Sequence, residues 1–211
     1  MKIDNIKLYE FLHEKEITHF FHANTLTTSL TFIENNGLMS RGLVEKLGLK
    51  QTIQCSDDKD EKFDVWEDIF IDTMDLHGYF PRQNLYGPIV FKFNIEFLLE
   101  DKLDIWITKD NPIYWTDKLT MQDKYFQDIN DLKVNWDNFD RQKKMFTIKN
   151  TSEAILFDFL EKIIVDNPNI ELGDETHVFN EVVRELKKIL LLKINMKKET
   201  VYHHVFVKKI I

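Results

Sequence analysis

The sequence is poor in the features that mark exported or disulfide-bonded proteins. Among its 211 residues there is one cysteine, Cys55, which cannot form an intramolecular disulfide and is too little for a structural zinc site. The N-terminal stretch MKIDNIKLYEFLHEKE alternates charged and apolar side chains and lacks the basic, apolar and small-residue order of an export signal. We therefore expect a protein of the reducing cytoplasm.

Long apolar runs and linker compositions are missing as well. The longest uncharged apolar stretches, such as residues 189–192, are far shorter than the roughly 20 residues that a membrane span needs. The chain has only 6 Gly and 4 Pro, and no internal repeat or Pro-rich or Gly/Ser-rich linker divides it. Because 43% of the residues are hydrophobic, enough for one core, we expect a single domain over residues 1–211 and no membrane span.

The charge balance is acidic, with a formal net charge of -8. This argues against a protein that coats nucleic acid, because backbone binding relies on Lys and Arg, but it does not exclude an enzyme that grips a short stretch. Acidic residues gather in 57–75 and basic residues in 184–209. The basic region indicates either an anionic partner or a solvated helix face followed by a charged edge strand.

The hydrophobic pattern predicts a mixture of short strands with a few helices. Helices are expected at residues 4–14, 25–35 and 175–192. Strands are expected at residues 17–21, 69–73, 89–94, 103–108, 145–149, 162–166 and 201–208. Gly37 should end the second helix in a left-handed conformation, and Gly173 with Asp174 should cap the last helix. The polar, aperiodic residues 51–64 predict a mobile loop that could serve as a lid. This pattern predicts an α+β fold.

Two polar clusters are candidates for chemistry. The first is ITHFFHANTL, residues 17–26, in which His19 and His22 would face opposite sides of a strand. The second is IDTMDLH, residues 71–77, with Asp72, Asp75 and His77. Together they contain the ligand types of a metallohydrolase, although their spacing matches no known metal motif and a structural role is the alternative. The chain lacks the G-x-G-x-x-G, P-loop, H-E-x-x-H and G-x-S-x-G motifs.

The first cluster carries a family resemblance. HFFHANTL followed by SLTFIENNGLMSR resembles the opening of the DarT-type ADP-ribosyltransferase toxins, in which a strand ending in histidine leads into a helix that stops at a Gly-Leu pair. Later elements resemble the family in the same order, at residues 87–112, 141–148, 154–168 and 203–209. The resemblance implies an ADP-ribosyltransferase-like split mixed and antiparallel β-sheet core flanked by helices.

The resemblance also implies an activity. It is the transfer of ADP-ribose from NAD⁺ to a nucleic acid, DNA or RNA, by a toxin of a toxin-antitoxin or phage-defence system with a neutralising antitoxin protein. Such a reaction passes through an oxocarbenium-like sugar, so the site must hold a bent dinucleotide and stabilise positive charge. By resemblance, His19, His22 and Asn24 bind NAD⁺, and either Arg41 or Arg82 grips its pyrophosphate.

The catalytic acid departs from the family pattern. The family places a glutamate on the strand matched by KKMFTI, where the best register puts Met145. Methionine can neither orient a ribose hydroxyl nor accept a proton. Either the register slips and Glu153 takes the role, or Asp72 or Asp75 substitutes, or catalysis is lost or altered. The predicted catalytic residues are therefore Glu153 and His19.

Three other functions stay open at this stage. A non-catalytic binding module with the same fold would explain Met145. An enzyme similar to the RNA 2′-phosphotransferases, on a related fold, would need clustered basic residues, which only the C-terminal segment offers clearly. A metallohydrolase would need metal bound by the two polar clusters.

Overall fold

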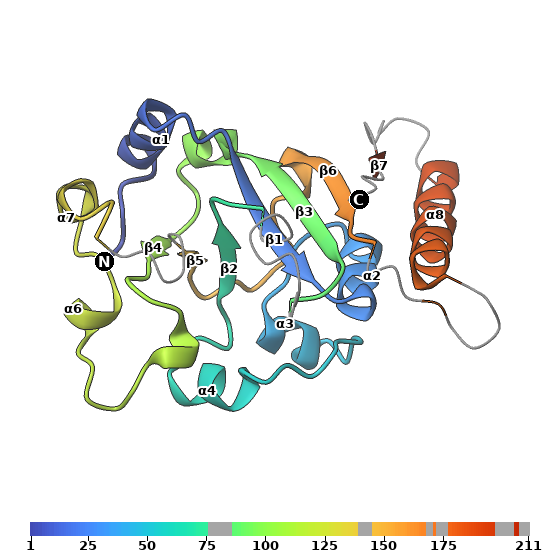
Figure 1. The fold of residues 1–211 in the computed structure, drawn as a ribbon, viewed down its shortest axis with the longest axis horizontal. Helices are drawn as coiled ribbons and strands as arrows, with labels where there is room; N and C mark the ends of the chain where they lie inside the picture. Colours follow the sequence, from blue (N-terminus) through green and yellow to red (C-terminus); the bar gives the residue numbers. More distant parts are fainter. Residues whose placement is uncertain (76–85, 139–144, 168–170, 172–176, 197–204, 207–211) are drawn as a thin grey trace.

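The fold is built around one mixed β-sheet (Figure 1). The computed structural model describes residues 1–75, 86–138, 145–167, 171, 177–196 and 205–206. The strand order in the sheet is β4-β5-β2-β1-β3-β6-β7. The strands are β1 (His19–Asn24), β2 (Ile69–Asp72), β3 (Ile89–Asn94), β4 (Ile105–Ile107), β5 (Met145–Ile148), β6 (Leu160–Val165) and β7 (Val205–Phe206). Neighbouring strands are antiparallel except β6 and β7, which are parallel.

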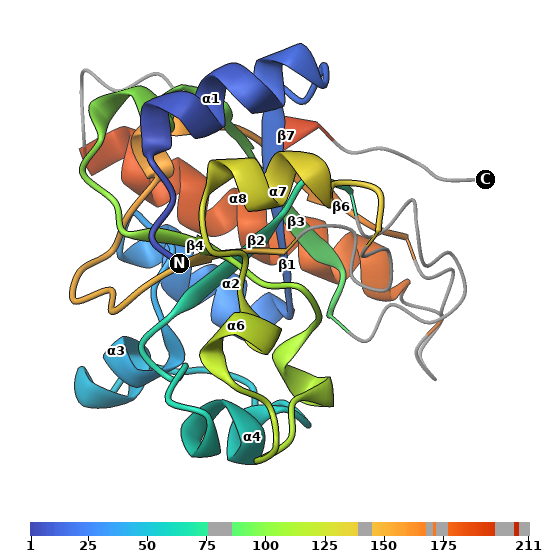
Figure 2. The same cartoon turned by 90° about the vertical axis from the view of Figure 1, so that its left-hand side faces the viewer.

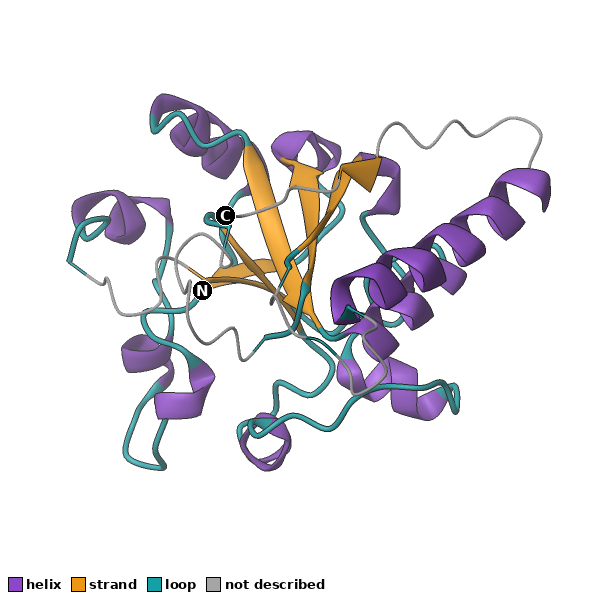
Figure 3. Ribbon diagram, turned by 45° about the vertical axis from the view of Figure 1, so that its right-hand side comes forward, coloured by secondary structure: helices purple, strands orange, loops and turns teal. Residues whose placement is uncertain are grey.

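Helices surround the strands (Figures 2 and 3). The α-helices are α1 (Asn5–Glu14), α2 (Leu26–Glu34), α3 (Arg41–Lys46), α4 (Asp57–Lys62), α6 (Met121–Lys124), α7 (Ile129–Val134) and α8 (Val178–Met196). The short 3-10 helices are η1 (Ile95–Glu100), η2 (Pro112–Tyr114) and η3 (Phe157–Phe159). Among the residues that the structure describes, no helix is both long and apolar enough to cross a membrane.

One face of the sheet carries the main hydrophobic core, and we call it the core face. Phe20 of β1, Phe91 of β3 and Phe146 of β5 lie on this face, with the Phe20 and Phe146 rings 4.7 Å apart. Side chains of α1, α2 and α8 pack into the same cluster. These helices present their apolar residues at helical spacing, whereas the strands present every second residue, so the two patterns meet in one interior.

The opposite face divides into an apolar part and a polar part, and we call it the polar face. Over β4, β5 and β2 it is covered by a second cluster, in which Tyr125 packs edge-on against Trp106 and Trp115. Over β1, β3 and β6 it carries the polar side chains His19, Lys92, Asn94 and Lys162. Their neighbours along the strands, such as Phe20, Phe91 and Phe93, point to the core face. The sheet therefore keeps a polar surface beside an apolar one.

The sheet is narrowly joined in its middle. β1 pairs with β3 along its whole length, from His19 opposite Asn94 to Asn24 opposite Ile89. Its pairing with β2 has the single register position Phe21 opposite Asp72. The sheet thus consists of two parts, β4-β5-β2 and β1-β3-β6-β7, which confirms the expected α+β fold with a split mixed and antiparallel sheet flanked by helices.

α2 ends before Gly37 as predicted, but the physical reason for the glycine is different. The left-handed residue is Asn36, with φ of 58°, and not Gly37. A Cβ on Gly37 would lie 2.5 Å from the backbone nitrogen of Ile155. Glycine is needed here because the chain passes this closely to form the bridge between Leu38 and Ile155.

Other boundaries also differ from the expectations. Residues 51–64 are not a plain loop, because they contain α4, which packs against η2. β1 begins at His19 and not at residue 17, since the amide of Ile17 donates to the Leu12 carbonyl at 2.9 Å and completes the turn after α1. β6 begins two residues before its expected start at 162. The expected cap of the last helix, Gly173 and Asp174, lies outside the described residues.

Candidate active site

Cross-strand pairing aligns side chains in a row across the polar face. Asp72 of β2 lies opposite both Met145 of β5 and Phe21 of β1. Lys92 of β3 lies opposite both Phe21 and Lys162 of β6. Directly opposite residues point to the same face of a sheet, so this row crosses the narrow join between the two parts.

A second row, next to the first, brings an imidazole and a carboxylate together. His19 lies opposite Asn94, and its Nε2 is 2.8 Å from Oε2 of Glu161. Asn94 donates from Nδ2 to Oε1 of the same carboxylate at 3.2 Å. The Nδ1 of His19 lies 2.8 Å from Oγ1 of Thr18. This network assigns the Nε2 proton to His19, because Glu161 can only accept when it is ionised.

A β-bulge places Glu161 on the polar face. Lys162 pairs with Lys92, but the next pair is Leu160 with Phe93, so Glu161 is an extra residue in the ladder. Bulges of this kind redirect a side chain and are common beside active sites. Without the bulge, strict alternation would put Glu161 and Lys162 on opposite faces.

Electrostatics keep Glu161 in its charged form. Burial alone would raise the pKa of Glu161, but hydrogen bonds from His19 and Asn94 and the charge of Lys92 together lower it. The Nζ of Lys92 lies 3.8 Å from Oε2. The side chains of His19 and Glu161 are 22% and 37% exposed, so both can be reached from outside. The pair can therefore hold hydroxyl groups and stabilise a developing positive charge.

His22 and Asn24 lie on the core side of β1, away from His19. The Nδ1–H of His22 donates to the Phe70 carbonyl at 2.7 Å, and its Nε2 is 3.2 Å from Nδ2 of Asn24. Burial lowers the pKa of His22, so the ring stays neutral and links β1 to β2. Asn24 accepts from the Thr25 amide at 2.8 Å. As expected from strand geometry, the two histidines face opposite sides, and NAD⁺ contacts by His22 and Asn24 stay predictions.

Arg41 is engaged with neighbouring helices. Its Nη2 donates to Oδ2 of Asp57 at 2.6 Å, and its guanidinium lies 5.2 Å from the ring centre of Trp66. Both side chains of the ion pair are 16% exposed. Arg41 therefore joins α3 to α4 with its charge balanced. The other predicted pyrophosphate ligand, Arg82, lies outside the described residues.

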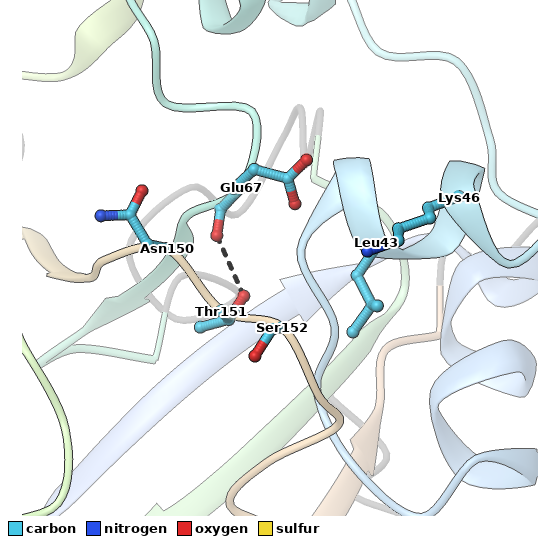
Figure 4. Close-up of a pocket in the computed structure, with 6 residues that line it drawn as sticks. All are labelled: Leu43, Lys46, Glu67, Asn150, Thr151 and Ser152. Atoms are coloured by element: carbon cyan, nitrogen blue, oxygen red, sulfur yellow. Dashed lines mark hydrogen bonds between the residues drawn. The ribbon is translucent and has the colours of Figure 1, made fainter.

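Glu153 lies apart from His19. It is an exposed residue beyond the end of β5, where Ile148 pairs with Ile69 at the start of β2. Met145, at the other end of β5, is the residue that pairs with Asp72 near His19. The residue before Glu153, Ser152, lines a pocket of about 190 Å³ (Figure 4). The pocket is lined by Leu43, Lys46, Glu67, Asn150, Thr151 and Ser152. The structure does not bring the two predicted catalytic residues together.

The two polar clusters do not combine into a metal site in the described part of the chain, where no group of three or more His, Cys, Asp or Glu side chains could hold a metal ion. Asp72 lies on the polar face and His22 on the core side. His77 lies outside the described residues.

Lys92, Asn94 and Glu161 were not among the site residues predicted from the sequence. A signal for the first two was present, because they alternate with Phe91 and Phe93 in an otherwise apolar strand. For Glu161 there was no signal, since a bulge changes the face of a side chain without leaving a mark in the hydrophobic pattern.

Comparison with solved structures places this site in a known fold. Thermus sp. 2.9 DarT in complex with ADP-ribosylated ssDNA aligns with a TM-score of 0.56 at 11% identity, over 92% of this chain and 95% of that one. The chain has the DarT fold. Thermus DarT in complex with carba-NAD⁺ gives 0.51 at 12% identity, over 92% and 97% of the two chains. The complex with NAD⁺ gives 0.50 at 11%, over 92% and 96%. Family models and curated proteins were compared as well, and none matches.

Proposed function

We propose that this protein is an NAD⁺-dependent ADP-ribosyltransferase that modifies nucleic acid and acts as a toxin. The observation that carries the proposal is the contact of His19 with Glu161 on the polar face of a DarT fold. The Thermus protein with this fold is known in complexes with NAD⁺ and with ADP-ribosylated ssDNA. An antitoxin that neutralises the activity is part of the same proposal.

The residues of the polar face suit this reaction. When bound, NAD⁺ would supply nicotinamide as the leaving group, and the nucleic acid would take its place on the ribose carbon. The Glu161 carboxylate would accept hydrogen bonds from ribose hydroxyls and stabilise the positive charge that develops as the bond to nicotinamide breaks, while His19 holds Glu161 by donating to it from Nε2. Phe21, between Asp72 and Lys92 in the neighbouring row, offers an aromatic surface beside them.

We assign the carboxylate role to Glu161 in place of Glu153. Glu161 contacts His19 at 2.8 Å, whereas Glu153 is exposed beyond the far end of β5. Asp72 is another carboxylate on the polar face. It is 5% exposed and lies opposite Met145, which occupies the position where the family resemblance expects a glutamate.

The test is transfer of label from NAD⁺ to single-stranded DNA or RNA. We expect labelled nucleic acid with the wild type and a loss on the order of a hundredfold in Glu161→Gln, as is typical when one charge-stabilising group is removed. Glu153→Gln serves as the matched control and should keep full activity. If Asp72→Asn abolishes transfer and Glu161→Gln does not, the acid is Asp72. If NAD⁺ is neither bound nor cleaved, the enzyme proposal fails.

Expression in cells tests the toxin role. A catalytic toxin should arrest growth, and His19→Ala should relieve the arrest while the protein still accumulates. A non-catalytic module, the reading that Met145 favours, would leave growth unchanged in both cases. Co-expression of the neighbouring reading frame, if it encodes the antitoxin, should restore growth with the wild type.

A further inference from the structure

We propose that Lys92 and Asn94 of β3 are positioning residues that hold the Glu161 carboxylate against His19 for the transferase reaction. This inference rests on the proposed function and deepens it. Neither residue needs to touch the sugar, because both act through Glu161.

The first argument is geometric. Asn94 donates to Oε1 of Glu161 at 3.2 Å, while His19 lies 2.8 Å from Oε2. Because Asn94 and His19 are directly opposite each other on neighbouring strands, their separation is set by the β-ladder. Contacts at both oxygens fix the plane of the carboxylate, which one contact alone would leave free to rotate.

The second argument comes from the bulge. Glu161 has no partner of its own in the β3–β6 ladder, so backbone pairing does not fix the direction of its side chain within the polar face. Its orientation depends instead on the side chains that meet it. Asn94 and Lys92 supply these contacts from β3, and they are two residues apart and so share one face.

The third argument is charge. Among the residues that the structure describes, the charged or titratable groups that act on Glu161 are His19 from β1 and Lys92 from β3. Lys162, the next residue along β6, lies directly opposite Lys92, and like charges in this arrangement are unfavourable. A carboxylate 3.8 Å from Lys92 offsets that repulsion, so Lys92 and an ionised Glu161 stabilise each other.

The experiment measures the titration of Glu161 by carbon NMR in the full-length protein, independently of turnover. In Lys92→Met and Asn94→Ala, the pKa of Glu161 should rise, because each change removes a group that lowers it. Lys92→Arg should restore the wild-type titration. Lys102→Met is the matched control, because Lys102 forms a Lys–Glu ion pair with Glu100 on the exposed surface, and it should change nothing.

Transfer kinetics give the second readout. We expect kcat in Lys92→Met and Asn94→Ala to fall on the order of tenfold to a hundredfold with a smaller change in KM. The acid limb of the pH profile should move to higher pH, and Lys92→Arg should recover both properties. Thermal unfolding of each variant shows whether the fold is kept.

The outcomes separate this inference from the proposed function. If the wild type transfers label but Lys92→Met and Asn94→Ala leave both the Glu161 titration and the pH profile unchanged, the positioning role is overturned and the transferase stands. If neither the wild type nor any variant transfers label, yet the Glu161 titration shifts as expected, the contacts are confirmed and the transferase proposal fails.

Discussion

At the scale of single residues, His22 links the two parts of the sheet where the ladder is shortest. Its Nδ1–H donates to the Phe70 carbonyl of β2, beside the one register position that pairs β1 with β2. Its ring also packs 5.7 Å from the ring of Phe32 in α2. A neutral imidazole is required, because a protonated ring would place a charge among buried groups and lose the acceptor that Asn24 uses.

This predicts a pH dependence of stability. Burial lowers the pKa of His22 below its ordinary value of 6.5, so below pH 6.5 the unfolded chain binds a proton that the folded chain does not. The contribution of His22 to the free energy of unfolding should therefore fall by about 1 kcal/mol as the pH drops from 7.5 to 5.5. Asp60, whose pKa burial raises to about 6, acts in the opposite sense, so the test compares variants. Over this range the free energy of urea unfolding of His22→Gln should fall by about 1 kcal/mol less than that of the wild type. His13→Gln, on the exposed side of α1, should keep the wild-type pH dependence.

The orientation of a side chain could be predicted where it depends only on the strand that carries it. The opposite orientation of His19 and His22 follows from strand alternation, and the structure has it. The partner of His19 could not be predicted, because Glu161 is far along the chain and reaches it only through strand order and a bulge. Arg41 matched a pyrophosphate ligand by residue type, but its partner Asp57 depends on α4, which the polar, aperiodic segment did not reveal.

At the scale of elements, a buried ion pair ties the start of β2 to the end of β5. The Nζ of Lys149 lies 2.6 Å from Oδ2 of Asp68, and the amide of Asn150 donates to Oδ1 at 3.0 Å. The Asp68 side chain is 1% exposed and that of Lys149 is 12% exposed. Burial raises the pKa of Asp68, and Lys149 and the Asn150 amide counteract this.

Lys149→Met should consequently destabilise the protein. It leaves an uncompensated carboxylate in the interior, which costs about 3–5 kcal/mol at neutral pH. Because the folded chain then holds a proton on Asp68 more readily than the unfolded chain, the deficit should shrink as the pH falls from 7.5 to 5. Urea unfolding at both pH values measures this. Lys62→Met is the control, because its ion pair with Asp117 is exposed and should contribute less than about 1 kcal/mol.

Helices and strands could be predicted where a hydrophobic pattern or a capping residue lies within the element itself. β3 lies at its expected residues 89–94, and α1 begins at Asn5, after Asp4 accepts from the Lys7 amide. The predictions were wrong where contacts with residues distant in the sequence determine the local structure. The glycine at position 37 is required by the close approach of Ile155. α4 has no buried residue of its own, so no apolar pattern marks it as a helix in the sequence. Propensity is a weak prior in such segments.

At the scale of the whole molecule, acidic side chains of α8 partly neutralise the positive charge of the basic C-terminal region. Arg184 of α8 forms ion pairs with Glu181 and Glu185, and Lys188 lies 3.9 Å from Glu185. In the described turns of α8, these contacts support the interpretation as a solvated helix face. In the described part of the chain, Lys92 and Lys162 on the polar face are positive charges that lie beside the proposed site.

The two hydrophobic clusters should unfold together. They lie on opposite faces of one sheet, so Phe70 of β2 packs in the second cluster while its neighbour Ile71 lies in the main core. Losing either cluster would expose the strands that support the other, which makes a partly unfolded state unfavourable. Cooperative unfolding of the two clusters is what the expectation of a single domain predicts.

Single-tryptophan variants test that cooperativity. Trp115 belongs to the second cluster and Trp136 to the main core, 5.0 Å from the ring of Phe11. With the other tryptophans replaced by Phe, fluorescence of Trp115 in one variant and Trp136 in the other should each coincide, in urea midpoint and slope, with the circular dichroism of the same variant. A fluorescence transition that departs from the circular dichroism would show that the two faces unfold separately. Because the second cluster lies over β4, β5 and β2, this part of the sheet would then be the unit that unfolds by itself, and the link from His22 to Phe70 would be too weak to prevent it.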